Sequence, residues 1–100
     1  MTQSYPTQEM KSLFLAISSL KNSSELSAFF RDLMTIQELE AVSTRWQIVL
    51  LLTQKLPYLE IAKRCHVSTT TVTRVALWVE HGQGGYKTAL SRLHSNIKNV

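Results

Sequence analysis

Short hydroxyl side chains gather just before and along one predicted helix near residue 70, and their chemistry suits the surface of DNA. Val72 and Val75 lie three residues apart, so they would bury one face of this helix and leave the other exposed. Short polar side chains on the leading turns of an exposed helix suit the major groove. The predicted exposed face consists of Thr69, Thr70, Thr73 and Arg74.

The stretch from Pro57 to Val79 predicts the helix-turn-helix that would present this face. Ala62 is small enough for the point where two helices cross, and Val67 would anchor the second helix from the turn. Ser68 can accept a hydrogen bond from the first turn of that helix as its N-cap. The side chains expected to point inward are Ile61, Ala62, Cys65, Val67, Val72 and Val75.

His66 occupies the turn, where many such motifs have glycine because the backbone tends toward a positive φ. Histidine tolerates a positive φ better than most residues, so His66 in the turn strains the predicted motif but does not exclude it. The alternative interpretation is an ordinary αα-hairpin inside a helical core. For the threonines themselves, a separate alternative is that they serve only helix capping and surface polarity.

An enzyme is a second class to consider, and the sequence does not favour it. The three histidines, His66, His81 and His94, lie in different predicted elements and lack the spacing of a metal-binding motif. No nucleophile, base and orienting group stand out together. We therefore expect neither an enzyme nor a metal site. A third class is a helical protein–protein interaction module that does not bind DNA, favoured if the basic half were paired with acids across a dimer.

The composition predicts one mostly helical domain of 100 residues, 44% of them hydrophobic, with three Gly and two Pro. Cys65 is the single cysteine, so no internal disulfide forms and no oxidising compartment is indicated. The first ten residues are polar and do not resemble a signal peptide. The apolar run 48–52 is too short to cross a bilayer, which takes roughly 20 residues. We expect a cytoplasmic protein.

The net charge of +4 is concentrated in the second half of the chain. Residues 1–54 hold four Lys/Arg against five acids, whereas residues 55–100 hold seven against two. The two halves therefore carry −1 and +5. A basic half that contains the helix-turn-helix is the expected footprint of a surface that contacts phosphates.

Three helices are predicted before the motif, over about 7–20, 25–34 and 36–55. Pro6 suits the first position of the first helix, and Ser24 is the expected N-cap of the second. Thr35 and Glu38 form a capping box at the start of the third helix. We expect residues 7–56 to form dimerisation helices, residues 57–81 the helix-turn-helix and residues 86–98 a last helix.

Two further features bear on assembly and on helix ends. The segment 48–52 leaves little polar surface around the third helix, so we expect a twofold copy of the chain to cover it; a fully internal central helix is the alternative. Gly82 is the expected left-handed C-cap of the second motif helix. The spacing of one apolar face suits docking of the last helix onto the dimer. This face comprises Tyr86, Leu90, Leu93 and Ile97.

The residues also resemble a known family over about 32–93. The segments LMTIQELEAVSTRWQIVLLL and LEIAKRCHVSTTTVTRVA resemble the trp repressor family, and VALWVEHGQGGYKTAL resembles its TrpR-like (YerC/YecD-type) branch. The resemblance implies an all-α, six-helix fold and an intertwined homodimer. It also implies a transcriptional regulator, a repressor that binds double-stranded operator DNA through the helix-turn-helix.

The resemblance assigns roles to individual positions. It places Thr69, Thr70 and Thr73 where the family faces bases and phosphates, beside the phosphate candidates Lys63, Arg64 and Ser68. Thr methyls can contact thymine methyls, and the hydroxyls can reach base edges or phosphates.

A second set of positions corresponds to the site at which the trp repressor holds its corepressor, L-tryptophan. Thr35, Arg45 and Arg74 stand there, and the two guanidinium groups can stack on an indole and pair with a carboxylate. Val75 replaces a small residue, and Trp78 replaces a serine that contacts the ligand. Both substitutions add bulk, and Trp78 has the volume to occupy the ligand's space. We therefore expect an effector that is not necessarily tryptophan.

Overall fold

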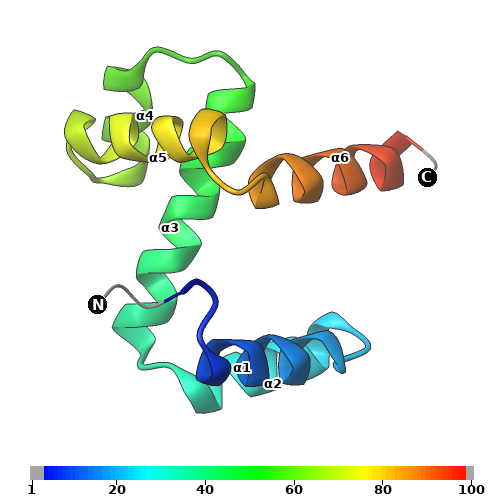
Figure 1. Ribbon diagram of the computed structural model, residues 1–100. Helices are drawn as coiled ribbons and strands as arrows, with labels where there is room; N and C mark the ends of the chain where they lie inside the picture. The colour runs from blue at the N-terminus through cyan, green and yellow to red at the C-terminus, as the bar shows by residue number, and fades with distance from the viewer. Residues whose placement is uncertain (1–3, 99–100) are drawn as a thin grey trace. The chain divides into compact units, whose positions relative to one another are not determined.

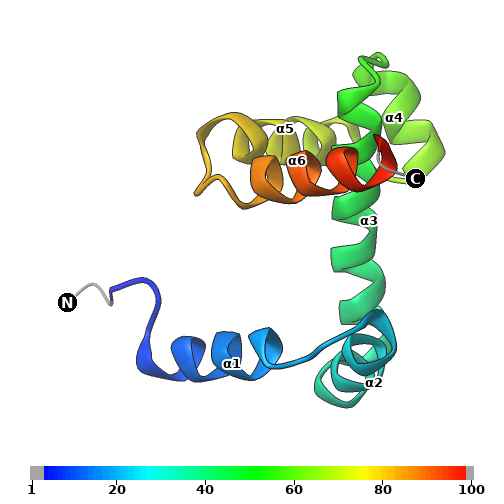
Figure 2. The same cartoon turned by 90° about the vertical axis from the view of Figure 1, so that its right-hand side faces the viewer.

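The computed structural model describes residues 4–98, and their side chains as far as His94, and within these limits it contains six α-helices and no strand (Figures 1 and 2). The helices are α1 (Gln8–Ser18), α2 (Ser23–Leu33), α3 (Ile36–Thr53), α4 (Tyr58–Cys65), α5 (Thr69–His81) and α6 (Gly85–Lys98). The chain divides into two units, residues 1–40 and 41–100, with the boundary inside α3. None of the described helices combines the length and apolar character needed to cross a membrane.

The helices of the first unit begin at side-chain caps. The Thr7 hydroxyl accepts a hydrogen bond from the backbone N–H of Met10 at 3.2 Å, so α1 begins after Thr7 and the expected start at Pro6 was wrong. The Asn22 carboxamide oxygen accepts one from the backbone N–H of Glu25 at 2.9 Å. Ser24 is therefore not the cap of α2, because the cap's extended backbone lies two residues earlier, at Asn22.

Two helices end earlier than the sequence predicted. The hydroxyls of Ser18 and Ser19 donate to the carbonyls of Leu15 and Ala16, at 3.0 and 2.7 Å, and α1 stops at Ser18 instead of continuing to residue 20. Such side-chain bonds compete with continuation of the helix. α3 stops at Thr53, and Lys55 then adopts a left-handed conformation with φ 59° that the sequence did not reveal.

The first unit has no buried side chain among residues 4–40. Its apolar side chains form contacts such as the edge-to-face pair of Tyr5 and Phe14, whose ring centroids lie 6.5 Å apart. Several remain well exposed, with Leu15 at 72% the extreme. The other exposed large apolar side chains of this unit include Met10, Phe14, Leu33 and Ile36. This unit therefore exposes several large apolar side chains to solvent.

The second unit holds the hydrophobic core, where α4 and α5 pack with the second half of α3. The core consists of Ile48, Val49, Ile61, Ala62, Val72 and Val75. Ile48 and Val49 are completely buried, and Leu51 and Leu52 pack against the core. The chain itself therefore covers much of the segment 48–52 that we expected a partner to cover. The exposed apolar side chains of the first unit therefore become the main reason to expect a partner.

The prediction that Gly82 is the left-handed C-cap of α5 was wrong. Gly82 has φ −82°, so it is not a left-handed C-cap. A Cβ atom at Gly82 would instead collide with the backbone carbonyl oxygen of Trp78, so close approach to the helix end requires glycine there. Gly84 is the left-handed residue, with φ 87°, and α6 begins immediately after it.

The predicted apolar face of the last helix is only partly used within the described part of the chain. Tyr86 and Leu90 pack against the core, whereas Leu93 is 44% exposed. The side chain of Ile97 lies outside the described residues. The start of α6 therefore packs against the core, whereas Leu93, further along the helix, is exposed to solvent.

Candidate nucleic-acid interface and adjoining cavity

The helix-turn-helix forms as the sequence predicted. Ile61, Ala62 and Val72 are buried in the core, and the backbone N–H of Val67 donates to the carbonyl of Ala62 at 3.0 Å across the turn. His66 lies in the left-handed region with φ 56° and ψ 44°, the conformation expected where such motifs have glycine. Cys65 and Val67 are half-buried and pack against the same core.

The second motif helix, α5, begins at the predicted cap. The Ser68 hydroxyl accepts a hydrogen bond from the backbone N–H of Thr71 at 3.2 Å. The same oxygen lies 3.1 Å from the hydroxyl oxygen of Thr71, close enough for a second hydrogen bond. These bonds fix the first turn of α5, the turn that would meet DNA.

All six predicted DNA contacts are exposed, namely Lys63, Arg64, Ser68, Thr69, Thr70 and Thr73. The Thr73 hydroxyl donates to the carbonyl of Thr69 at 3.0 Å, so its oxygen can still accept a bond from a base donor. A hairpin sunk in a helical core would bury this face. The exposed hydroxyls therefore argue against that alternative.

Arg64 is not a free cation, because its Nε lies 3.0 Å from Oε1 of Glu60 on the preceding turn. Both side chains are about half exposed. An exposed pair of this spacing contributes only about 0.3–0.5 kcal/mol, so a phosphate could displace the carboxylate. Lys63, one position earlier, has no ion pair with the carboxylates described, which leaves it the stronger phosphate candidate.

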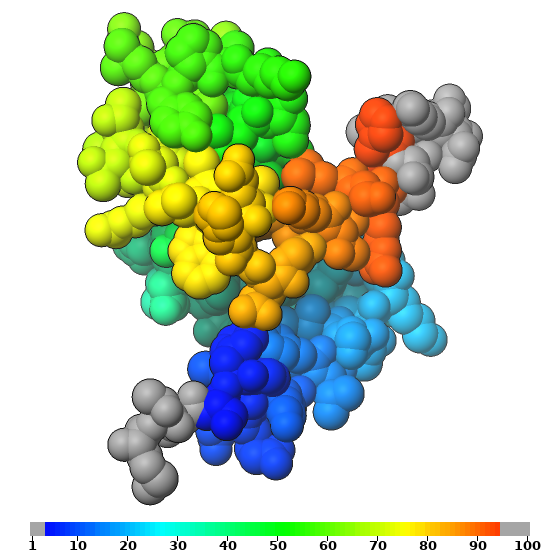
Figure 3. All heavy atoms as spheres, turned by 45° about the horizontal axis from the view of Figure 1, so that its top comes forward, coloured from blue at the N-terminus to red at the C-terminus, as the bar shows by residue number. Residues whose placement is uncertain are grey.

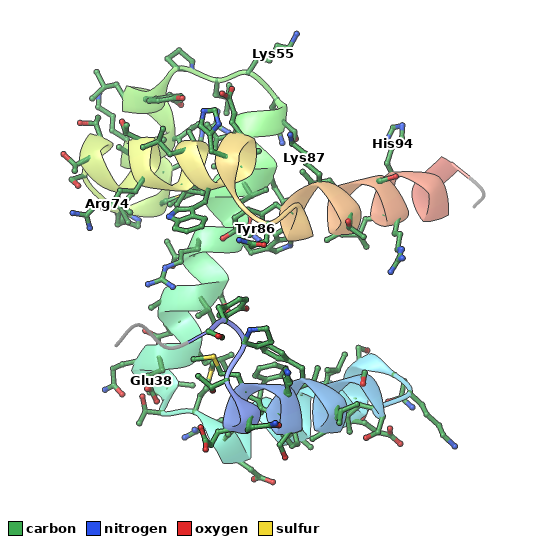
Figure 4. The ribbon with its side chains drawn as sticks, viewed as in Figure 1. Glu38, Lys55, Arg74, Tyr86, Lys87 and His94 are labelled. Carbon is green, nitrogen blue, oxygen red and sulfur yellow. The ribbon has the colours of Figure 1, made fainter. Side chains whose placement is uncertain are left out.

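A cavity of about 560 Å³ lies in the second unit beside the motif, lined by Arg45, Thr71, Arg74, Val75, Trp78 and Tyr86. Figure 4 labels two of these residues, Arg74 on α5 and Tyr86 at the start of α6. Four of these residues follow helical spacing on α5, so a single helix face forms most of the wall. Figure 3 shows the end of α5 in yellow and the start of α6 in orange, next to each other on the surface. The cavity thus adjoins the recognition helix.

Trp78 forms one wall of this cavity and leaves it open. The residue is 62% exposed, whereas Val75 is 6% exposed and belongs to the core. Trp78 therefore does not occupy the space that its volume would allow it to fill. A smaller hollow of about 330 Å³ lies beyond it, also bordered by Tyr86 and by Gly82.

Three of the four predicted effector contacts line the cavity: Arg45, Arg74 and Trp78. Thr35 belongs to the first unit, where its hydroxyl accepts a bond from the N–H of Glu38 at 3.1 Å and its N–H donates to the Glu38 carboxylate at 2.9 Å. The predicted capping box is thus present. The bond from the Thr35 N–H to the carboxylate is the main cause that lowers the pKa of Glu38 below its ordinary value, and a side-chain hydrogen bond with Thr35 adds to it.

Two lining residues were missed by the sequence analysis. Thr71 lies one turn before Arg74, a spacing that could have identified it. Tyr86 was predicted only as an apolar docking residue. Its ring is held near that of Trp46, with centroids 6.3 Å apart and planes inclined by 30°. No local spacing in the sequence could have indicated that contact between α3 and α6.

The cavity is electrostatically positive. Arg45 and Arg74 are its charged lining residues, and neither forms an ion pair with any carboxylate described here. A ligand of this cavity would therefore meet two uncompensated positive charges.

The architecture and the exposed hydroxyl face define an all-α protein of the helix-turn-helix class. Residues 8–94 match the family described as Trp repressor protein, and the chain belongs to this family. It is 34% identical to the uncharacterized protein YerC of Bacillus subtilis (strain 168) over 86 residues, which cover 86% of this chain and 83% of YerC. This relative places it in the TrpR-like, YerC-type branch.

Two solved structures are also similar to this chain. A crystal structure of a TrpR-like protein from Eubacterium eligens ATCC 27750 matches with a TM-score of 0.82 and 37% identity, over 89% of this chain and 92% of that one. A crystal structure from Staphylococcus aureus matches with a TM-score of 0.80 and 32% identity, over 88% of each chain. The Trp repressor family comprises DNA-binding regulators and not enzymes, which confirms the prediction of a non-enzyme.

Proposed function

We propose that this protein is a transcriptional regulator that binds operator DNA as a homodimer and represses transcription. The observation that supports this most directly is the orientation of α5. Val72 and Val75 bury one face in the core, while the hydroxyls near the start of the helix stay exposed. The family of DNA-binding regulators and the charge of +5 on residues 55–100 support the same conclusion.

The apolar surface of α1 and α2 supports dimerisation. Leu15 is 72% exposed and Leu33 is 47% exposed, and no side chain among residues 4–40 is buried. A second copy would remove these side chains from water. In the dimer, two recognition helices would enter successive major grooves roughly 34 Å apart. Sedimentation equilibrium tests this step, and a stable monomer at micromolar concentration would contradict it.

Binding to a random-sequence duplex tests the DNA-binding step. We expect the logarithm of the affinity to fall linearly with the logarithm of the salt concentration, because each neutralised phosphate releases counterions. Lys63→Ala should weaken binding to all sequences alike and reduce the slope by about 1. Lys21→Ala, an exposed lysine of the first unit, is the matched control and should leave the slope unchanged.

The absence of binding even at low salt would contradict the proposal. It would favour the alternative, a helical protein–protein interaction module without DNA binding. An unchanged slope in Lys63→Ala would contradict the phosphate assignment alone, since other cations of the basic half would then account for the salt dependence.

We also infer that the cavity beside α5 binds a small effector, with Arg45, Arg74 and Trp78 as contacts. Support comes from its volume, which lies in the range of small-molecule sites, and from its place on the other face of the recognition helix. The assignment of Thr35 as an effector contact remains an expectation from the resemblance alone. Direct titration of the full chain with small aromatic acids, such as indole-3-propionate, tests this inference.

A further inference from the structure

We propose that Glu60 is a specificity-determining residue of the DNA interface, which lowers the affinity for non-specific DNA and holds the Arg64 guanidinium group in place for the operator. This inference rests on the proposed DNA-binding function and adds a residue to it. Glu60 does not need to touch a base. It acts through the charge and the orientation of Arg64, one of the phosphate candidates.

Glu60 is an isolated acid in a basic segment. It is the only acidic residue between Ala41 and Val79, the part of the chain that contains the helix-turn-helix. Attraction between cations and phosphates supplies essentially all of non-specific binding to DNA, and a carboxylate among these cations weakens it. Glu60 therefore reduces the sequence-independent part of the affinity. The basic residues of the same segment are Arg45, Lys55, Lys63, Arg64 and Arg74.

The Glu60 carboxylate pairs with one basic side chain and leaves part of it free. Its Oε1 accepts a hydrogen bond from Nε of Arg64 at 3.0 Å. The bond engages Nε alone, and within the described part of the chain neither terminal Nη group is hydrogen-bonded. A phosphate can therefore approach the two Nη groups of the planar fork while the ion pair stays in place.

The pair restricts the Arg64 side chain before DNA arrives. Glu60 precedes Arg64 by four residues on α4, and an acid followed by a base is the favourable order for this spacing. A long side chain loses rotamer freedom when it forms an ordered contact, and this loss lowers affinity. Glu60 imposes part of that order in the free protein. A phosphate at the matching position thus meets a guanidinium group that is already oriented.

These two effects of Glu60 differ in weight between random DNA and an operator. Net charge dominates binding to a random duplex, so there the repulsion between the carboxylate and the phosphates prevails. On an operator, base contacts of α5 fix the register of the protein on the duplex, and the oriented fork of Arg64 offsets the repulsion. Glu60 therefore lowers the non-specific affinity more than the operator affinity.

A pair that only stabilises the helix is the alternative explanation. Glu60 lies in the first turn of α4 and Arg64 in the last, where each charge complements the helix dipole. Removal of the carboxylate would then lower the melting temperature and leave DNA affinity unchanged or weaker. If Glu60 acts on DNA, a similar loss of at most about 4 °C accompanies tighter binding to random DNA. The sign of the change in affinity separates the two explanations.

Fluorescence anisotropy with two duplexes tests the proposal: one of random sequence, and the tightest one that the parent selects from a randomised library. Glu60→Gln keeps the shape of the side chain and an acceptor oxygen but removes the charge. Because a dimer loses two carboxylates, the random duplex should bind at least about fivefold more tightly at low salt. The selected duplex should gain less, so the ratio of the two affinities should fall by at least about threefold.

Unchanged or weaker binding of the random duplex in Glu60→Gln would overturn the proposal, and so would an unchanged ratio. Glu60→Asp keeps the charge and should retain the parent's ratio within about twofold. If it behaved as Glu60→Gln does, the charge would not be the cause. Glu9→Gln, which removes an exposed carboxylate of the first unit, is the matched control and should bind the random duplex as the parent does.

Arg64→Lys tests the orienting role separately. Lysine keeps the positive charge but lacks the planar fork, so this variant should weaken the selected duplex at least about threefold more than the random duplex. Equal weakening of both duplexes would overturn the orientation of Arg64 by Glu60.

Failure of the proposed function gives a different result from failure of this inference. If the parent binds neither duplex at low salt, or selects no sequence from the library, sequence-specific DNA binding is itself refuted. If the parent binds and selects a sequence but Glu60→Gln behaves identically, only the role of Glu60 is refuted.

Discussion

The Ser68 and Thr71 hydroxyl oxygens lie 3.1 Å apart at the start of α5, and they belong to two different surfaces. Ser68 is exposed on the proposed DNA face, whereas Thr71 lines the cavity with Arg45 and Arg74. Ser68 also accepts the backbone N–H of Thr71 at 3.2 Å. This pair is a direct physical connection between the two proposed sites.

Ser68→Asp separates the structural role of Ser68 from its role at DNA. Aspartate caps a helix as well as serine does, so the free energy of unfolding should stay within about 0.5 kcal/mol of the parent. Its carboxylate would face phosphates, so the affinity for every duplex should fall, and most steeply at low salt. Ser68→Ala is the control: it should cost about 1 kcal/mol of stability through the lost cap. Unchanged DNA affinity in Ser68→Asp would remove Ser68 from the interface.

Thr71→Val tests the connection itself. Valine keeps the shape of the side chain and the backbone N–H that Ser68 caps, but it loses the hydroxyl that meets Ser68. We expect only a modest loss of stability, about 0.5–1.5 kcal/mol, the usual net value of one hydrogen bond. Any change in DNA affinity that a saturating cavity ligand such as indole-3-propionate produces should shrink. Thr71→Ser retains the hydroxyl and should behave as the parent. The same ligand-induced change in DNA affinity in the parent, Thr71→Val and Thr71→Ser would refute the connection.

Thr70→Ala should relax base preference while leaving non-specific binding intact. Thr70 is exposed on the leading turn of α5, where its methyl and hydroxyl can contact a base edge. A lost base contact reduces discrimination at one base pair by about 1–3 kcal/mol. Competition binding with a randomised duplex library measures this directly. A uniform loss across all sequences would indicate a phosphate contact at Thr70 instead.

Much of the helix-turn-helix, and the start of α3, could be predicted because their determinants are local. The Ser68 cap, the Thr35–Glu38 capping box and the buried positions of α4 and α5 each depend on spacings of three or four residues. The left-handed conformation of His66 followed from the type of turn. These features need no knowledge of the rest of the chain.

The missed features depend on contacts between distant segments or on competition between neighbouring caps. Tyr86 joins the cavity because α6 brings its ring near Trp46, 40 positions earlier in the numbering. Gly82 is required by the carbonyl of Trp78 and not by its own φ angle. At α2, Asn22 and Ser24 both suit an N-cap, and only the backbone shows that Asn22 is used.

His66→Gly should stabilise the protein. His66 has φ 56° and ψ 44°, a region that costs a residue with a Cβ atom about 1 kcal/mol and costs glycine almost nothing. The free energy of unfolding from urea titration should therefore rise by up to about 1 kcal/mol. His66→Val should instead lower the free energy of unfolding, because a β-branched side chain is still less compatible with this region. DNA affinity should not change in His66→Gly, and a loss of stability there would mean that the imidazole makes a stabilising contact.

The depressed pKa of Glu38 should make stability depend on pH at the start of α3. Hydrogen bonds from Thr35, the backbone N–H foremost, favour the charged carboxylate and hold its pKa below the ordinary 4.5. The carboxylate's contribution is therefore fully present above the unfolded-state pKa and is lost as the pH falls through the folded-state pKa. Glu38→Gln keeps an acceptor for the capping box but does not titrate in this range. The melting temperature of the parent should accordingly fall more than that of Glu38→Gln between pH 7 and pH 3, and parallel curves would show that this box contributes nothing to acid sensitivity.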